Sequence, residues 1–182
     1  MTHHPSLSDP RIARSQQRLR DALLELTLER GWDDVSVQQI CARAGVGRST
    51  FYVHFADREE LLLAAFRSEH IVPRRLQPEP LAFVRPLLEH VGGHRPLYNA
   101  LVGTSCERAV HRRFHQVVAS LIDRDLTKHA ANPGSQRPTA LRYLTGAFCE
   151  TLTHWLEQRN APSSCEMEQL LKQYSRPVFG CV

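Results

Sequence analysis

Apolar residues recur every three to four positions through most of the chain, a spacing that predicts amphipathic helices. The first such stretch follows Asp9-Pro10, a pair that suits a helix start because aspartate caps the first turn and proline is tolerated there. Gly31 is a typical helix stop. No stretch alternates as a strand would. We therefore predict an all-α fold whose first helix spans residues 10–31, with apolar positions at Ile12, Leu19, Ala22, Leu23, Leu26 and Leu28.

Two short helices are predicted next, and a tight turn joins them. Ser36 with Gln39 forms a capping-box pattern, which indicates a sharp helix start. Gly45 suits the left-handed residue that ends such a helix. A second short amphipathic segment begins at Arg48, about three residues later.

A further helix is predicted after Asp57 and Glu60, which repeat the capping pattern before an apolar run. Residues 71–80 contain three prolines and predict a domain junction. Beyond the junction only helical periodicity is found. The predicted helices there are 80–91, 95–102, 106–130, 138–159 and 164–176.

This pattern predicts a flexible arm over residues 1–9, a domain of closely spaced helices over 10–70, and a C-terminal helical bundle over 71–182. Five cysteines without a C-x-x-C pair predict reduced thiols. No segment fits a transmembrane helix or a signal peptide, so we expect a cytoplasmic protein without membrane contact. The net charge of +4 is compatible with polyanion binding, but residues 1–70 hold nine arginines against ten acidic residues. Net charge therefore does not decide whether this domain binds DNA, and the positions of its basic side chains must be considered instead.

The most informative stretch is SVQQICARAGVGRSTFYVHFADREELLL, residues 36–63. Its small and apolar residues have the spacing of a helix-turn-helix, in which two short helices share a core across a glycine turn. These residues are Ile40, Cys41, Ala44, Gly45, Val46 and Phe51.

The stretch resembles the TetR family of transcription regulators in Ala44-Gly45-Val46, Arg48, the run from Thr50 to Phe55, and Asp57-Arg58-Glu59. Arg95 to Tyr98 and Trp155 to Glu157 resemble a variety of its C-terminal domain. The resemblance implies an N-terminal three-helix helix-turn-helix DNA-binding domain over residues 10–70 and a C-terminal helical dimerisation and effector domain over 71–182. It implies a DNA-binding regulator, most often a ligand-responsive repressor that binds a palindromic operator as a homodimer. The alternative is a TetR-like coactivator or adaptor that acts through protein contacts.

The resemblance implies that the second short helix enters the major groove. Arg48 is then the expected base reader, because a guanidinium binds guanine through two hydrogen bonds, and Ser49 is a second candidate. Val53 replaces a frequent histidine and would favour a thymine methyl group. The remaining expected DNA contacts, mostly to phosphates, are Ser36, Thr50, Tyr52, His54 and Arg58.

Two of these assignments keep alternatives open. Arg58 could instead be a surface residue of the first helical turn that pairs with acidic neighbours. Arg11, Arg14 and Arg18 could follow the DNA backbone or simply face solvent. Gly47 stands where a serine cap is common, which costs only a few tenths of a kcal/mol.

The C-terminal domain is expected, from the resemblance, to form a four-helix dimer interface and to hold an effector cavity. The alternative for all of these apolar residues is packing inside one chain. The dimer candidates are Leu141, Leu144, Phe148, Leu152, Trp155, Leu156, Met167, Leu170, Leu171 and Tyr174. The cavity candidates are Phe83, Leu87, Tyr98, Leu101, Phe114 and Val118.

Other classes of function have less support. A metal sensor could use the four-residue spacing of Glu107, His111 and His115, or of His90 and His94, but arginines interrupt the first set. Redox sensing by Cys41 or Cys181 is equally weak. No catalytic motif is present, so we expect no enzyme, no metal and no cofactor.

Overall fold

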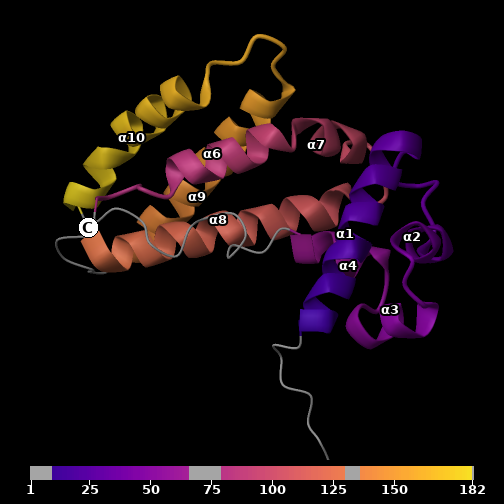
Figure 1. The fold of residues 1–182 in the computed structure, drawn as a ribbon. Coiled ribbons are helices and arrows are strands. Elements are labelled where there is room, and N and C mark those ends of the chain that lie inside the picture. Colours follow the sequence, from indigo (N-terminus) through magenta and orange to yellow (C-terminus); the bar gives the residue numbers. More distant parts are fainter. Residues whose placement is uncertain (1–9, 66–78, 130–135, 182) are drawn as a thin grey trace, which may run out of the picture. The chain divides into compact units, whose positions relative to one another are not determined.

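The computed structural model describes residues 10–65, 79–129 and 136–181, and within them nine helices and no strand (Figure 1). The predicted all-α fold is confirmed. The predicted arm, and most of the proline-rich junction, lie outside the described residues. Within the described part, no helix is long and apolar enough to cross a membrane.

The described residues form two compact units. The N-terminal unit consists of residues 10–65 together with residues 100–107, and the C-terminal unit of residues 79–99 and 108–181. The sequence placed the whole of 71–182 in one C-terminal domain. The structure differs at residues 100–107, because the turn between two later helices packs with the N-terminal helices.

The N-terminal unit contains α1 (Pro10–Arg30), α2 (Val37–Ala44), α3 (Arg48–His54) and α4 (Arg58–Ala65). In Figure 1 the short α2 and α3 lie beside the longer α1, which packs on α2 and α4. The buried side chains that join these helices are apolar, and their removal from water is the main stabilising term. They include Leu19, Leu23, Leu26, Trp32, Val35, Ile40, Cys41, Phe51, Phe55, Leu61 and Leu62.

The turn between α2 and α3 depends on a left-handed glycine. Gly45 has φ +59° and ψ +40°, and the N–H of Val46 donates to the Cys41 carbonyl at 3.0 Å. At the other end of α2 the predicted capping box is confirmed. The Gln39 N–H donates to Ser36 Oγ at 3.3 Å, and the Ser36 N–H donates to Gln39 Oε1 at 2.7 Å. Both ends of α2 are therefore set by local sequence.

The C-terminal unit contains α6 (Val84–Gly93), most of α7 (Arg95–Leu101) and of α8 (Glu107–His129), α9 (Arg137–Glu157) and α10 (Ser164–Cys181). α10 packs on α6 and α9, and α6 also packs on α9. One apolar core joins the helices and includes Phe83, Leu87, Val118, Ile122, Phe148, Leu152, Trp155 and Leu171.

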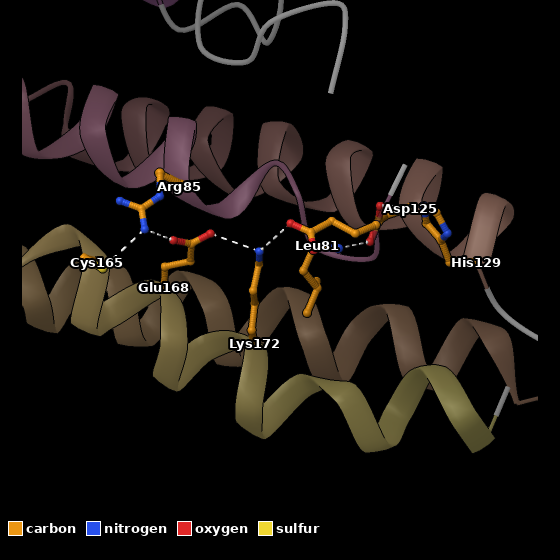
Figure 2. A network of polar contacts seen from close by, with 8 residues as sticks. Leu81, Arg85, Asp125, His129, Cys165, Glu168 and Lys172 are labelled. Atoms are coloured by element: carbon orange, nitrogen blue, oxygen red, sulfur yellow. Dashed lines mark hydrogen bonds and ion pairs between the residues drawn. The ribbon is translucent and has the colours of Figure 1, made fainter. Parts of the chain in front are cut away.

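A network of ion pairs joins α10 to α6 (Figure 2). The buried carboxylate of Glu168 lies between two cations, 2.5 Å from Arg85 Nη2 and 3.0 Å from Lys172 Nζ. Lys172 also contacts Glu79 at 3.1 Å. Burial alone would lower the pKa of Lys172, but its bonds to Glu168 and Glu79 raise it above its ordinary value. The network thus links α10 to α6 and to the residues that precede it.

The start of α6 differs from the predicted position at residue 80. Leu81 has φ +63°, a conformation unusual for a residue with a side chain, and its N–H donates to Asp125 Oδ2 at 2.7 Å. Burial raises the pKa of Asp125, and the Leu81 N–H opposes that shift. Because this bond holds Leu81 outside a helix, α6 begins three residues later, at Val84.

Two other helix ends were also predicted wrongly. Gly92 and Gly93 were expected to follow the end of this helix, but they form the last two residues of α6. A Cβ on Gly92 would come within 2.9 Å of the Trp155 ring. Gly92 therefore serves close packing. α10 continues past the predicted end at residue 176 and through Pro177, and the next turn places Phe179 in the core.

We expect Gly45→Ala to lower the free energy of unfolding by about 1 kcal/mol or more, because a left-handed conformation is costly for any residue with a Cβ. Gly93→Ala is the matched control, since nothing lies within 4 Å of its added Cβ and its φ is ordinary. It should cost nothing. Urea unfolding of both variants measures the difference, and equal stabilities would contradict this role for Gly45.

Candidate nucleic-acid interface

The α3 helix has one buried face and one solvent-exposed face. Phe51 is fully buried, and Phe55 is buried just beyond the helix end. Tyr52 is 51% exposed and Val53 is 77% exposed, although both are large side chains that folding usually covers. Because Phe51 packs in the core, Tyr52 and Val53 face outward.

The other predicted residues of α3 extend the same surface. Arg48 and Ser49 are exposed, and Thr50 and His54 are partly buried. The Arg48 side chain makes no hydrogen bond or ion pair within the described residues, so its donors are available to a ligand. Burial raises the pKa of Cys41, and the nearby charge of Arg48 opposes this only in part. A buried, protonated thiol does not suit redox sensing at Cys41.

Arg43, in contrast, is fully engaged within the unit. Its guanidinium donates to both carboxylate oxygens of Glu29 at 2.8 Å, and to Glu25 at 3.1 Å. The hydrogen bond from Arg43 lowers the pKa of Glu29. This contact ties the end of α2 to α1 and removes one cation from the charge that the unit can offer to DNA.

Arg58 is also turned into the unit. Its Nη1 donates to the Trp32 carbonyl at 2.6 Å and to the Val35 carbonyl, and its guanidinium lies 4.5 Å from the centre of the Trp32 ring. No acidic residue pairs with it among the described residues, so the alternative assignment to a surface ion pair is wrong. The phosphate contact expected of Arg58 stays a prediction, limited to the donors other than Nη1.

Two further predicted residues lie at the ends of α2. The Ser36 hydroxyl caps α2, so part of its hydrogen-bonding capacity is used. The guanidinium of Arg18 lies against the turn that follows α2, where a Cβ on Gly45 would meet Arg18 Nη2 at 2.6 Å. The structure thus brings Arg18 to the helix-turn-helix.

The predicted cavity residues are not all brought together. Phe83, Leu87 and Val118 belong to the core of the C-terminal unit, and Tyr98 and Phe114 pack against it. Leu101 is buried in the N-terminal unit, so this member of the set is corrected. Sequence reasoning missed Thr145, whose buried hydroxyl has no hydrogen-bond partner among the described residues.

Most predicted dimer residues pack in the core of their own chain, which is the alternative that the sequence analysis left open. The apolar spacing marked the inner faces of α9 and α10, not their outer faces. The buried members are Leu144, Phe148, Leu152, Trp155, Leu156, Met167 and Leu171, with Leu141 partly buried. The exposed members are Leu170 at 38% and Tyr174 at 69%, and Tyr143, which is not among the predicted residues, is 63% exposed.

The histidine spacings do not form a metal site in the part of the chain that the structure describes. Glu107 accepts a hydrogen bond from the Gly103 N–H, and His111 and His115 are exposed. The rings of His90 and His94 lie 4.5 Å apart but lack a third ligand.

Comparison with known families identifies both units. Residues 19–65 match the model of the bacterial regulatory proteins of the tetR family, and residues 79–176 match a transcriptional regulator C-terminal region. The chain belongs to the TetR family. It is therefore a helix-turn-helix transcription regulator, as the residues around Gly45 indicated. TetR-family regulators bind DNA and are generally not enzymes.

Solved structures of other regulators, among them a TetR transcriptional regulator, have the same fold. One from Streptococcus agalactiae is 23% identical, with a TM-score of 0.64 over 96% of this chain and 99% of that one. NalD of Pseudomonas aeruginosa, the secondary repressor of the MexAB-OprM multidrug efflux pump, is 21% identical, with a TM-score of 0.59 over 91% and 97%. The dihydroxyacetone kinase operon activator DhaS is 18% identical, with a TM-score of 0.65 over 92% and 96%. No curated protein sequence matches the chain. At these identities the likeness concerns the fold.

The Arg58 contacts lead to a test that separates a structural role from a phosphate contact. Arg58→Ala should lower the free energy of unfolding by about 1 to 3 kcal/mol, because it removes the hydrogen bonds to the Trp32 and Val35 carbonyls and leaves the Val35 carbonyl unpaired. Arg30→Ala, at the exposed end of α1, should stay within about 0.5 kcal/mol of the parent. Urea unfolding measures both. A stable Arg58→Ala protein that binds DNA with a reduced salt dependence would assign the residue to phosphate instead.

Proposed function

We propose that this regulator binds a palindromic operator as a homodimer and represses transcription until a small effector releases it. The observation that carries the proposal is the exposed face of α3, where Tyr52 and Val53 project outward beside the unpaired Arg48. These large side chains are held away from the core by the buried Phe51, so they add little to the stability of the fold. Insertion into the major groove gives them a role.

The side chains divide by chemistry into base readers and phosphate contacts. Arg48 binds guanine O6 and N7 through two hydrogen bonds, and Val53 contacts a thymine methyl group. Thr50, Tyr52 and His54 donate to phosphates, and Ser49 serves as a secondary base contact. The resulting half-site contains at least one guanine and a nearby thymine.

A second copy of the chain supplies the other half-site. Tyr143 on α9 and the pair Leu170 and Tyr174 on α10 are exposed apolar or aromatic side chains of the C-terminal unit. Exposed aromatics are typical of protein interfaces. A two-fold dimer through this surface matches the symmetry of a palindrome.

The effector binds within the C-terminal unit and makes at least one polar contact. The buried Thr145 hydroxyl supports this, because an unpaired hydroxyl in an apolar core is costly unless a ligand satisfies it. NalD is a repressor and DhaS an activator, so relatives of this fold act in both directions. Repression is our proposal, together with a cytoplasmic location and no enzymatic activity.

The base-reading role of Arg48 can be measured by fluorescence anisotropy on duplexes from the chain's own promoter region. Arg48→Ala should cost about 1 to 3 kcal/mol and relax preference at one base pair per half-site. Arg30→Ala should bind like the parent. Equal loss on operator and scrambled DNA would refute base reading by Arg48. If the parent shows no specific DNA binding but tight binding to a protein, the chain is a coactivator.

The dimer surface predicts that Tyr174→Glu shifts the protein to monomers, because a charge would be buried between the copies. Leu28→Glu is the matched control, since Leu28 is also exposed but lies on α1. Sedimentation at micromolar concentration distinguishes the two. A dimeric Tyr174→Glu protein, or a parent that is monomeric, would contradict this interface.

A further inference from the structure

The turn between α7 and α8 belongs to the DNA-binding unit, although it is distant from α1–α4 along the chain. Ser105 is the polar contact of this turn. Its hydroxyl donates to Asp33 Oδ1 at 2.7 Å and accepts from Trp32 Nε1 at 3.3 Å. One serine therefore binds two successive residues of the segment that joins α1 to α2.

The turn is itself well defined. Leu101 and Cys106 are buried, and the Thr104 hydroxyl donates to the Leu101 carbonyl at 2.6 Å. The Gly103 N–H donates to Glu107 Oε2 at 2.9 Å. A turn anchored in this way places the Ser105 hydroxyl at a definite position, so its two hydrogen bonds can position their partners.

Trp32 connects this turn to the DNA-binding helices. The indole is buried, Ser105 holds its N–H, and Arg58 of α4 covers its ring and binds its carbonyl. Arg58 also binds the carbonyl of Val35, next to Ser36, the cap of α2. The short segment that precedes α2 is therefore held by two sets of hydrogen bonds, one from α4 and one from the α7–α8 turn.

We propose that Ser105 is a positioning residue for DNA reading, and that the α7–α8 turn sets the orientation of α2 and α3. The inference rests on the DNA-binding function proposed above.

The test measures operator affinity and tryptophan emission in the same full-length protein. The chain has two tryptophans, so Trp155→Phe leaves Trp32 as the sole reporter. In this background Ser105→Ala should shift the Trp32 emission to longer wavelength, because water replaces the serine hydroxyl. Operator affinity should fall about threefold to tenfold, because two hydrogen bonds are lost and part of their net free energy positions the reading helix. Affinity for scrambled DNA should not change, because phosphate contacts do not need an exact helix orientation.

Two controls separate positioning from a general loss of structure. Ser120→Ala removes a hydroxyl that bonds only its own helix, at the Val117 carbonyl, and should leave both readouts unchanged. Ser105→Thr keeps the hydroxyl and should restore operator affinity. All measurements are made below the onset of thermal unfolding of each variant.

A double-mutant cycle completes the test. The double variant Asp33→Ala, Ser105→Ala should lose no more operator affinity than the more affected single variant, because both changes remove the same hydrogen bond between Ser105 and Asp33. The inference is overturned if Ser105→Ala binds the operator as tightly as Ser120→Ala does. It is also overturned if Ser105→Ala lowers the affinity for operator and for scrambled DNA by the same factor. A parent protein with a normal Trp32 response but no specific DNA binding would instead refute the proposed function, and this inference with it.

Discussion

The burial of Phe51 is the contact on which the proposed DNA-binding surface depends. This side chain occupies the inner face of a helix of only seven residues, too short to be stable alone. Tertiary packing must therefore hold α3, and the same packing fixes which residues face outward. The exposure of Tyr52 and Val53 is a geometric consequence of the buried ring beside them.

Features encoded by neighbouring residues could be predicted from the sequence. The start of α2 depends on Ser36 and Gln39, and its end on Gly45, so a local pattern was sufficient. The start of α6 depends on a hydrogen bond between Leu81 and Asp125, 44 residues apart, which no local pattern reveals. Pro177 shows the same limit, because core packing by Phe179 outweighs the usual helix-breaking effect of proline.

The candidate site divides in the same way. The face of α3 followed from helical spacing and resemblance, since one buried residue fixes the others. The position of Arg58 could not be predicted in this way, because its hydrogen-bond partners are backbone carbonyls and no residue type in the sequence identifies them. Helical spacing on α9 and α10 marked residues such as Phe148 and Leu171, but spacing alone cannot distinguish a core face from an interface. The exposed Tyr143 became evident only when these faces were separated.

The internal use of Arg43 has a consequence for how this regulator finds its site. Residues 1–70 hold nine basic and ten acidic side chains, whereas residues 71–182 hold fourteen and nine. With Arg43 neutralised by glutamates, the DNA-binding unit attracts DNA of arbitrary sequence only weakly. On the proposed function, such a protein would spend little time on the rest of the chromosome, so a few copies would suffice to occupy a single operator, at the expense of a slower search along the duplex.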